Sequence, residues 1–477
     1  MNLREYHSIL GRRDFLRDCA GGVGLIALSQ LLAGDARADA VAANPLAPRQ
    51  PHFAPHAKNV IFLFMEGGPS QLDLFDPKPA LAKLNGEPLP ESMRKGLRFA
   101  FIKPTAKVWA SQRPFRQYGQ SGMQFSDWMP HMAACADDLC MVRSMYSDQF
   151  NHHPGQLLLH CGSPLVGRPS MGSWLLYGLG SESQNLPGFV ALASGRGSSS
   201  SSAIFTNGFL PSLYQGVPFS SSGDPIPYLS NPAGMTSEDQ RARLDVIREM
   251  NQLRQQDTGD AEIASRIASY ELAFRMQAAA PELLDLSKES PGTLAAYGID
   301  KELTATYAKN CLMARRLVER GVRMVLVSYA SWDDHASLLS GHHRSCQATD
   351  QSAAALIQDL KQRGLLKDTL VVWGGEFGRT PLAQSISPGH EDQTGRDHHP
   401  DGFTMLLAGG GIKAGTVLGQ TDELGMKVLE DKVHIHDLHA TILQCLGMNH
   451  LQLTYRYQGR NFRLTDVAGN VVRKMLA

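Results

Sequence analysis

Short apolar runs recur along the chain, and most of them end in glycine and polar residues. Runs of this length without alternation are typical of strands buried on both faces of a parallel sheet. Longer amphipathic segments lie between them and predict helices, so the elements alternate as in a doubly wound α/β fold, a mostly parallel sheet sandwiched by helices. The predicted strands cover residues 58–65, 139–144, 189–192, 322–329, 369–373 and 403–408, and the main predicted helices 237–256, 260–280, 302–320, 351–364 and 435–446.

Two segments interrupt this alternation. Residues 80–130 predict an irregular insertion with one helix around Lys95. Residues 194–232 are rich in glycine, serine and proline and include five consecutive serines from Ser198. Such a composition indicates a surface excursion or a small cap over the sheet edge rather than a domain boundary. We therefore expect a single domain from residue 58 to residue 477.

The first 40 residues predict an export signal. Arg12 and Arg13 precede an apolar run at residues 23–32, and small residues that suit cleavage follow at 36–40. This order is typical of the twin-arginine route. Ten apolar residues are too few to span ~30 Å of hydrocarbon, so a membrane anchor does not fit. We expect a periplasmic or extracellular protein with no stable membrane span after signal removal, and a linker at residues 41–57.

Charge and cysteine content narrow the function classes. Lysine plus arginine and aspartate plus glutamate number 46 each, so no overall field draws the chain to nucleic acid or to an anionic membrane. Six cysteines follow the signal. An even number of cysteines in an oxidising compartment is compatible with one or two disulfides. The spacing of these cysteines is not that of a cysteine-rich zinc site. We expect most of these cysteines to be buried small hydrophobes.

Polar clusters follow several predicted strands, at the place where open α/β sheets bind ligands. An aspartate and a histidine two residues apart in an extended segment point the same way and can share one metal. Such ions polarise phosphoryl or sulfuryl oxygens and activate water. The alternative is that these are solvated ion pairs, with Glu376 as the first-turn acid of a helix. The clusters are Glu66 with Ser70 and Asp73, Asp333 with His335, Glu376 with Arg379, and Arg396 with Asp397 and His398.

Six motifs together resemble the domain of unknown function 1501 family, exported bacterial proteins grouped with the alkaline phosphatase and sulfatase superfamily. The resemblance covers nearly the whole mature chain. It implies an alkaline phosphatase-like three-layer architecture with a site at the strand ends. The motifs are Glu66-Gly67-Gly68-Pro69-Ser70 with Asp73, Arg168-Pro169-Ser170-Met171-Gly172-Ser173-Trp174, Trp332-Asp333-Asp334-His335, Gly375-Glu376-Phe377-Gly378-Arg379-Thr380-Pro381, Gly395-Arg396-Asp397-His398 and Gly419-Gln420-Thr421-Asp422-Glu423.

The resemblance also implies roles for residues. Catalytic members of the superfamily hold two metals with a first-strand acid, two Asp-His pairs and a later histidine. By order along the chain, Glu66 or Asp73 stands for the first acid, Asp333 and His335 for one pair, and His398, beside Asp397, for the last histidine. Glu376 stands for the acid of the other pair, but Phe377 follows it where the superfamily has histidine, which removes one ligand.

The nucleophile is less defined than the ligands. The superfamily uses a Ser, Thr or Cys after the second strand, and the candidates here are Ser70, Ser147 and Ser170. Ser170 is a plausible N-cap, where helix amides can receive an anion. The Cys-x-Pro-x-Arg sulfatase signature does not occur in the sequence, and water is a further candidate. Arg379 and Arg396 are expected to orient the anionic oxygens.

The sequence therefore predicts an exported, metal-dependent hydrolase of sulfate or phosphate esters. Its cofactor is a divalent ion such as zinc, manganese or calcium, and its substrate an anionic ester such as one on a polysaccharide. The missing histidine and the undefined nucleophile favour a second hypothesis, a catalytically inactive member that binds a ligand or partner at the cell surface. A third is a structural protein whose clusters are ion-paired loops.

Overall fold

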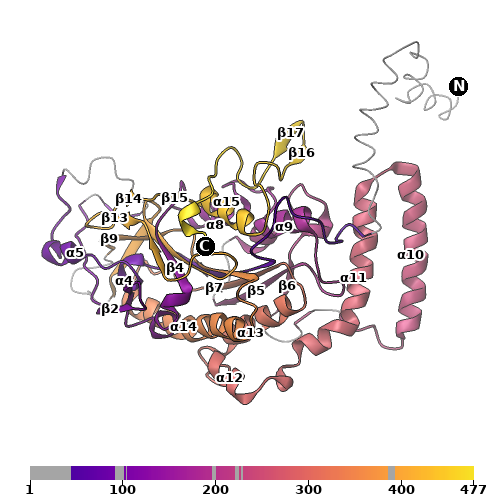
Figure 1. Ribbon diagram of the computed structural model, residues 1–477, viewed down its shortest axis with the longest axis horizontal. Helices are drawn as coiled ribbons and strands as arrows, with labels where there is room; N and C mark the ends of the chain where they lie inside the picture. Colours follow the sequence, from indigo (N-terminus) through magenta and orange to yellow (C-terminus); the bar gives the residue numbers. More distant parts are fainter. Residues whose placement is uncertain are drawn as a thin grey trace, which may run out of the picture. The chain divides into compact units, whose positions relative to one another are not determined.

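A sheet of nine strands forms the centre of the molecule (Figure 1). Its order is β12-β4-β11-β8-β1-β7-β5-β6, and β15 pairs with β4. Every pairing is parallel except the two that β11 makes, with β4 and with β8. The strands are β1 (Asn59–Glu66), β4 (Leu139–Tyr146), β5 (Phe189–Gly195), β6 (Val217–Phe219), β7 (Met324–Ala330), β8 (Thr369–Gly374), β11 (Phe403–Ala408), β12 (Thr416–Leu418) and β15 (Val433–His434).

The structure is a computed structural model. It describes residues 44–91, 101–103, 105–195, 200–220, 225–226, 229–384 and 393–477. The expected export signal and the helix expected around Lys95 lie outside these residues. Residues from Pro48 to Ala477 group into one compact unit.

Helices cover both faces of the sheet. In Figure 1, α8, α9 and α15 lie on one face and α13 and α14 on the other, so the predicted three-layer α/β class is confirmed. The helices are α4 (Gln71–Leu74), α5 (Pro79–Leu84), α7 (Pro130–Ala133), α8 (His152–Cys161), α9 (Met171–Leu179), α10 (Ser237–Thr258), α11 (Ala261–Leu284), α12 (Pro291–Tyr297), α13 (Ala305–Glu319), α14 (Leu338–Gln362) and α15 (Ile435–Cys445). Two-stranded pairs lie outside the main sheet: β2 (Phe115–Tyr118) with β3 (Met123–Ser126), β9 (Gly378–Gln384) with β10 (Gly395–His399), β13 (Gln420–Thr421) with β14 (Val428–Glu430), and β16 (Tyr455–Tyr457) with β17 (Arg460–Phe462).

Strand β1 shows why its apolar run has no alternation. All eight of its residues are buried. Ile61, Leu63 and Met65 belong to the large core that also contains side chains of α13 and α14. Successive side chains of a strand point to opposite faces, and the rings of Phe62 and Phe64 instead contact His160 of α8. Both faces of the strand are therefore covered by helices.

Two predicted boundaries differ from the structure. Helix α14 begins at Leu338 rather than at residue 351, so the histidines at 342 and 343 lie on a helix. The segment at 194–232 is more than a surface excursion, because its residues Val217–Phe219 form the edge strand β6.

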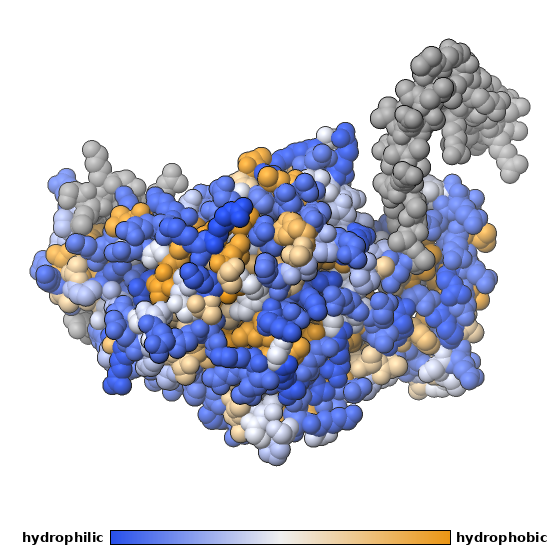
Figure 2. Space-filling view, viewed as in Figure 1, coloured by the Kyte–Doolittle hydropathy of each residue, from blue (hydrophilic) through white to orange (hydrophobic). Residues whose placement is uncertain are grey.

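Cys135, Cys140, Cys161, Cys311, Cys346 and Cys445 are buried and unpaired with one another, as expected for small hydrophobic residues. Among the described helices, none combines the length and the apolar character that crossing a membrane requires. Hydrophilic residues cover most of the face seen in Figure 2, and apolar residues lie between them in separate groups.

Candidate metal centre

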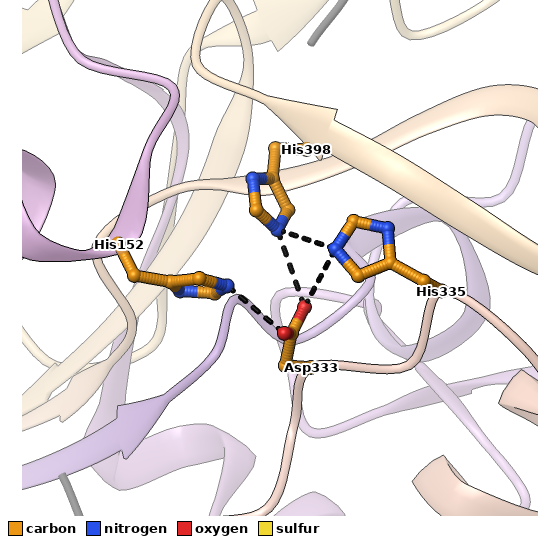
Figure 3. Close-up of side chains that lie close together, drawn as sticks. All are labelled: His152, Asp333, His335 and His398. Carbon is orange, nitrogen blue, oxygen red and sulfur yellow. Dashed lines mark hydrogen bonds and ion pairs between the residues drawn. The ribbon is translucent and has the colours of Figure 1, made fainter. Parts of the chain in front are cut away.

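Four side chains meet at one edge of the sheet: His152, Asp333, His335 and His398 (Figure 3). One possible ligand atom of each lies within 4.8 Å of the others. The sequence predicted the last three of these as ligands. His152 was missed, although it also follows a predicted strand.

The sheet topology explains why these residues meet. His152 follows β4 and Asp333 and His335 follow β7, and these strands run in the same direction. His398 precedes β11, which runs the opposite way and so begins at the edge where the other strands end. The carboxyl ends of parallel strands and the start of one antiparallel strand thus share one crevice.

Close packing fixes the loop that carries Asp333. The backbone nitrogen of Trp332 donates to the carbonyl of Glu66, 3.1 Å away. Gly67 has a φ of +114°, and a Cβ atom added there would be 2.5 Å from the backbone nitrogen of Asp333. Glycine is needed at this position both for its conformation and for the close approach of the two loops.

Each imidazole is oriented by a hydrogen bond from its Nδ1 atom. The partners are oxygen atoms, and a carbonyl or a carboxylate can only accept. The proton therefore sits on Nδ1, and in the neutral ring the Nε2 atom carries the lone pair. The bonds are His398 to the Phe150 carbonyl, 2.7 Å, His152 to Glu376 Oε1, 2.8 Å, and His335 to Gln384 Oε1, 2.7 Å.

The three Nε2 atoms converge on the Asp333 carboxylate. His335 Nε2 and His398 Nε2 are 3.0 and 3.2 Å from Asp333 Oδ1, and His152 Nε2 is 3.1 Å from Oδ2. The Nε2 atoms of His335 and His398 are only 2.9 Å apart. Lone pairs that face each other and a carboxylate at such distances repel one another, so the cluster requires a cation or protons between its atoms.

Protons satisfy this requirement only in part. Burial lowers the pKa of His398 to about 4, against the opposing hydrogen bond to Asp333. Burial also disfavours a charged His152, but its bonds to Asp333 and Glu376 prevail and raise its pKa to about 9. Burial opposes ionisation of Asp333 as well, but the imidazoles and Arg379 hold its pKa well below the usual range. At neutral pH His398 is therefore uncharged, with its lone pair turned into the cluster.

The donor set fits a transition metal. Three imidazole nitrogens and one carboxylate suit zinc and are acceptable to manganese. Calcium takes six to eight oxygen ligands, and this nitrogen-rich cluster does not provide them. Of the three predicted ions, calcium fits least.

Glu376, a predicted ligand, lies beside the cluster, and Phe377 packs against two of its imidazoles. The Glu376 carboxylate is fully buried and accepts bonds from the Gly67 backbone, from Gln156 and from His152 Nδ1. It supports a ligand and is not one of the four clustered residues. The Phe377 ring packs against His398, with centroids 4.4 Å apart, and against His152 at 5.1 Å. Phe377 has no ligand atom, and the imidazole beside it is that of His152, which comes from helix α8.

Arg379 and Arg396 were expected to orient an anion, but the structure gives both guanidinium groups partners within the protein and buries them fully. Arg379 donates to Asp333 Oδ1 at 2.7 Å and to backbone carbonyls, including that of Gly68 at 2.9 Å. Arg396 pairs with Asp73 at 2.8 Å and lies over the Trp109 ring. Arg379 therefore fixes Asp333, and Arg396 is structural.

The remaining predicted ligands lie outside the cluster. Asp73 is occupied by Arg396 and by the Ser70 hydroxyl, 2.5 Å away. Asp397 accepts bonds from the backbone nitrogens of Phe101 and Ile102. Glu66 is buried at the end of β1 and is not one of the four clustered residues.

The three candidate hydroxyls also have other partners. Ser70 donates to Asp73, Ser147 accepts from the backbone nitrogen of Gln149, and Ser170 bonds to the Ser173 hydroxyl. All three serines are buried. Within the described residues, no hydrogen bond joins one of these hydroxyls to the cluster, so the structure offers no support for a serine nucleophile.

The family model described as "Protein of unknown function (DUF1501)" matches residues 57–476. The chain belongs to this family. The resemblance of the six motifs to the domain of unknown function 1501 family is thus confirmed. No curated protein matches the chain.

Several solved structures are similar to the chain. The lipoteichoic acid synthase LtaP from Listeria monocytogenes is 9% identical with a TM-score of 0.40, and the match covers 90% of this chain and 80% of that one. The PsFucS1 sulfatase from Pseudoalteromonas sp. is 12% identical with a TM-score of 0.35, covering 84% and 68%. A protein in the alkaline phosphatase superfamily from Vibrio parahaemolyticus is 10% identical with a TM-score of 0.34, covering 86% and 71%.

Proposed function

We propose that this DUF1501 protein is an exported, metal-dependent hydrolase of sulfate or phosphate esters. Its ligands are His152, Asp333, His335 and His398. The observation that carries the proposal is the convergence of three imidazole Nε2 atoms on one carboxylate, within 4.8 Å, while each Nδ1 is bonded elsewhere. Such a set is costly to fold unless a cation occupies its centre.

The chain's own residues define the site around the ion. A divalent ion held by these ligands would supply Lewis acidity, which would polarise an ester oxygen and activate water. Glu376, Gln384 and the Phe150 carbonyl fix the orientations of the imidazoles. Because the candidate serine hydroxyls bond elsewhere, we favour water as the nucleophile over a covalent intermediate. The substrate is an anionic ester, such as one carried by a polysaccharide.

A second candidate function is ligand binding at the cell surface without turnover. Two observations favour it. Phe377 stands where the superfamily has a histidine, and its ring fills the space beside His398. The two arginines expected to hold an anion are fully buried and paired within the protein. In this alternative the ion serves to bind an anionic ligand or partner.

Elemental analysis of the full exported protein tests the proposal, with an Asp333→Ala/His398→Ala variant beside it. His343→Ala is the matched control, since His343 is exposed and stacks on Trp128 instead of joining the cluster. About one equivalent of a transition metal in the parent and control, and none in the double variant, supports the metal centre. A parent protein purified and reloaded without binding any metal overturns it.

Turnover separates the two candidate functions. The metal-loaded protein is assayed with 4-nitrophenyl sulfate and 4-nitrophenyl phosphate. Hydrolysis that disappears in the double variant supports the hydrolase. Metal binding without hydrolysis of either ester favours the binding protein. Export is tested by replacing Arg12 and Arg13 with lysine, which should stop the mature protein from reaching the periplasm.

A further inference from the structure

The ring of Phe101 lies over the metal centre. Its centroid is 5.5 Å from that of His335 and 5.6 Å from that of His398, and it is nearly perpendicular to both rings, at 83° and 82°. The Phe101 side chain is 60% exposed. A single exposed apolar residue is ordinary on a protein surface. This one differs from the others in its position, because its ring contacts two imidazoles of the cluster.

A buried carboxylate holds Phe101 in this position. Asp397 Oδ2 accepts from the backbone nitrogens of Phe101 at 2.7 Å and of Ile102 at 3.1 Å, while its Oδ1 accepts from the nitrogen of His398 at 2.9 Å. The exposed fraction of Asp397 is 0%. Through these three bonds one carboxylate ties the backbone of Phe101 and Ile102 to the strand that carries His398, and losing any of them leaves a buried polar group short of a partner.

The His398 ring contacts one aromatic residue that is buried and another that is exposed to solvent. Phe377 packs on the His398 ring from inside the protein, where it is 1% exposed. Phe101 contacts the same ring but is open to solvent. A molecule that approaches these imidazoles from solvent can therefore contact the Phe101 ring. Aromatic rings pair favourably edge to face or offset, by about 0.5–1.5 kcal/mol beyond their burial.

We infer that Phe101 forms a subsite for an aromatic ring directly attached to the anionic group, so that the site prefers aryl esters over alkyl esters. Asp397 is a positioning residue that acts through Phe101. The inference rests on the proposed function, because it needs an anion bound at the cluster. It adds the chemical class of the group next to that anion.

Binding of two inert phosphonates tests this without requiring turnover. Equilibrium dialysis with the zinc-loaded full chain compares phenylphosphonate with methylphosphonate. We expect phenylphosphonate to bind roughly 2- to 12-fold more tightly, the ratio equivalent to the energy of an aromatic pair. Phe101→Ala should bring the ratio to about one without loss of zinc. Tyr270→Ala is the control, because Tyr270 is an aromatic residue of α11 with 43% exposure, and the ratio should persist.

The outcomes distinguish the inference from the proposed function. Equal binding of both phosphonates by the parent overturns the subsite and leaves the anion site intact. A ratio that survives Phe101→Ala overturns it as well. If zinc binds but neither phosphonate does, the proposed function fails and the inference with it. Asp397→Asn should lower the ratio while zinc content is kept, and loss of zinc would instead assign Asp397 to the support of His398.

Discussion

The proton on His152 gives a quantitative test of its place among the ligands. Its bonds to Asp333 and Glu376 outweigh burial and raise its pKa to about 9 in the metal-free protein. A metal ion coordinates the neutral ring through Nε2, the atom that faces Asp333. Binding at pH 7 must therefore displace a proton from His152.

The size of the effect follows from the difference between the pKa of His152 and the pH of the experiment. At pH 7 a group with a pKa of about 9 is about 99% protonated. Metal affinity should rise about tenfold per pH unit up to about pH 9, so the proton costs about 3 kcal/mol of binding free energy at pH 7. His398 adds nothing to this count at pH 7, because burial lowers its pKa to about 4.

Calorimetry can isolate this proton. Zinc is titrated at pH 7 into the parent and into His152→Ala, each in two buffers with different ionisation enthalpies. The parent should release about one proton more per zinc than the variant, and His343→Ala should behave like the parent. Equal proton release by the parent and His152→Ala would refute the reasoning, because His152 would then not be a ligand.

Three further predictions concern the surroundings of the site. Burial lowers the pKa values of His160 and His439 to about 3 in the folded protein. In the unfolded chain the same histidines take up protons below about pH 6.5. The free energy of unfolding should therefore fall as the pH drops below 6.5, by about 2 kcal/mol per histidine at pH 5. Urea unfolding at pH 7.5 and pH 5 measures this, and a constant value would contradict it. Gly67→Ala places a Cβ atom 2.5 Å from the Asp333 backbone and should reduce bound metal in elemental analysis, whereas Gly86→Ala, with a φ of +83° and no atom within 4 Å, should only lower stability by about 1–2 kcal/mol. Asp73→Ala leaves a guanidinium buried without its partner and should cost about 3–5 kcal/mol in urea unfolding; a loss of metal without this destabilisation would restore Asp73 as a ligand.

The strands could be predicted from the sequence, but the direction of one of them could not. The run at residues 403–408 was predicted as a strand and has these bounds in the structure. A strand buried on both faces has the same apolar pattern in either direction. The reversal of β11 is set by its pairing with β4 and β8, and it is this reversal that brings His398 to the other ligands.

The sequence could predict those site residues whose position depends only on the strand that they directly follow. Asp333 and His335 share a short loop, and both join the cluster. Asp397 and His398 are successive residues of β10, and the pairing of β10 with β9 is irregular between Arg396 and His398. Strand alternation alone therefore could not decide which of the two residues joins the cluster, and in the structure it is His398. His152 was missed because its loop carries two adjacent histidines, and which one faces inward depends on where α8 begins. The pairing of Arg379 with backbone carbonyls leaves no trace in the sequence.

The pair Glu376-Phe377 decides how many ions the centre holds. The resemblance implies two metals, and paired ions lie about 3.5–4 Å apart between two ligand sets. Here the four ligand atoms lie within 4.8 Å of one another, which is the size of one coordination sphere. The carboxylate that would serve a second ion is bonded to His152 Nδ1, Gln156 and the Gly67 backbone, and the adjacent ring covers His398. One equivalent of metal per chain is therefore expected in the parent, and Glu376→Gln should weaken binding by roughly 10- to 100-fold as a supporting residue does. Two equivalents in the parent, falling to one in Glu376→Gln, would show instead that Glu376 turns from His152 to bind an ion itself.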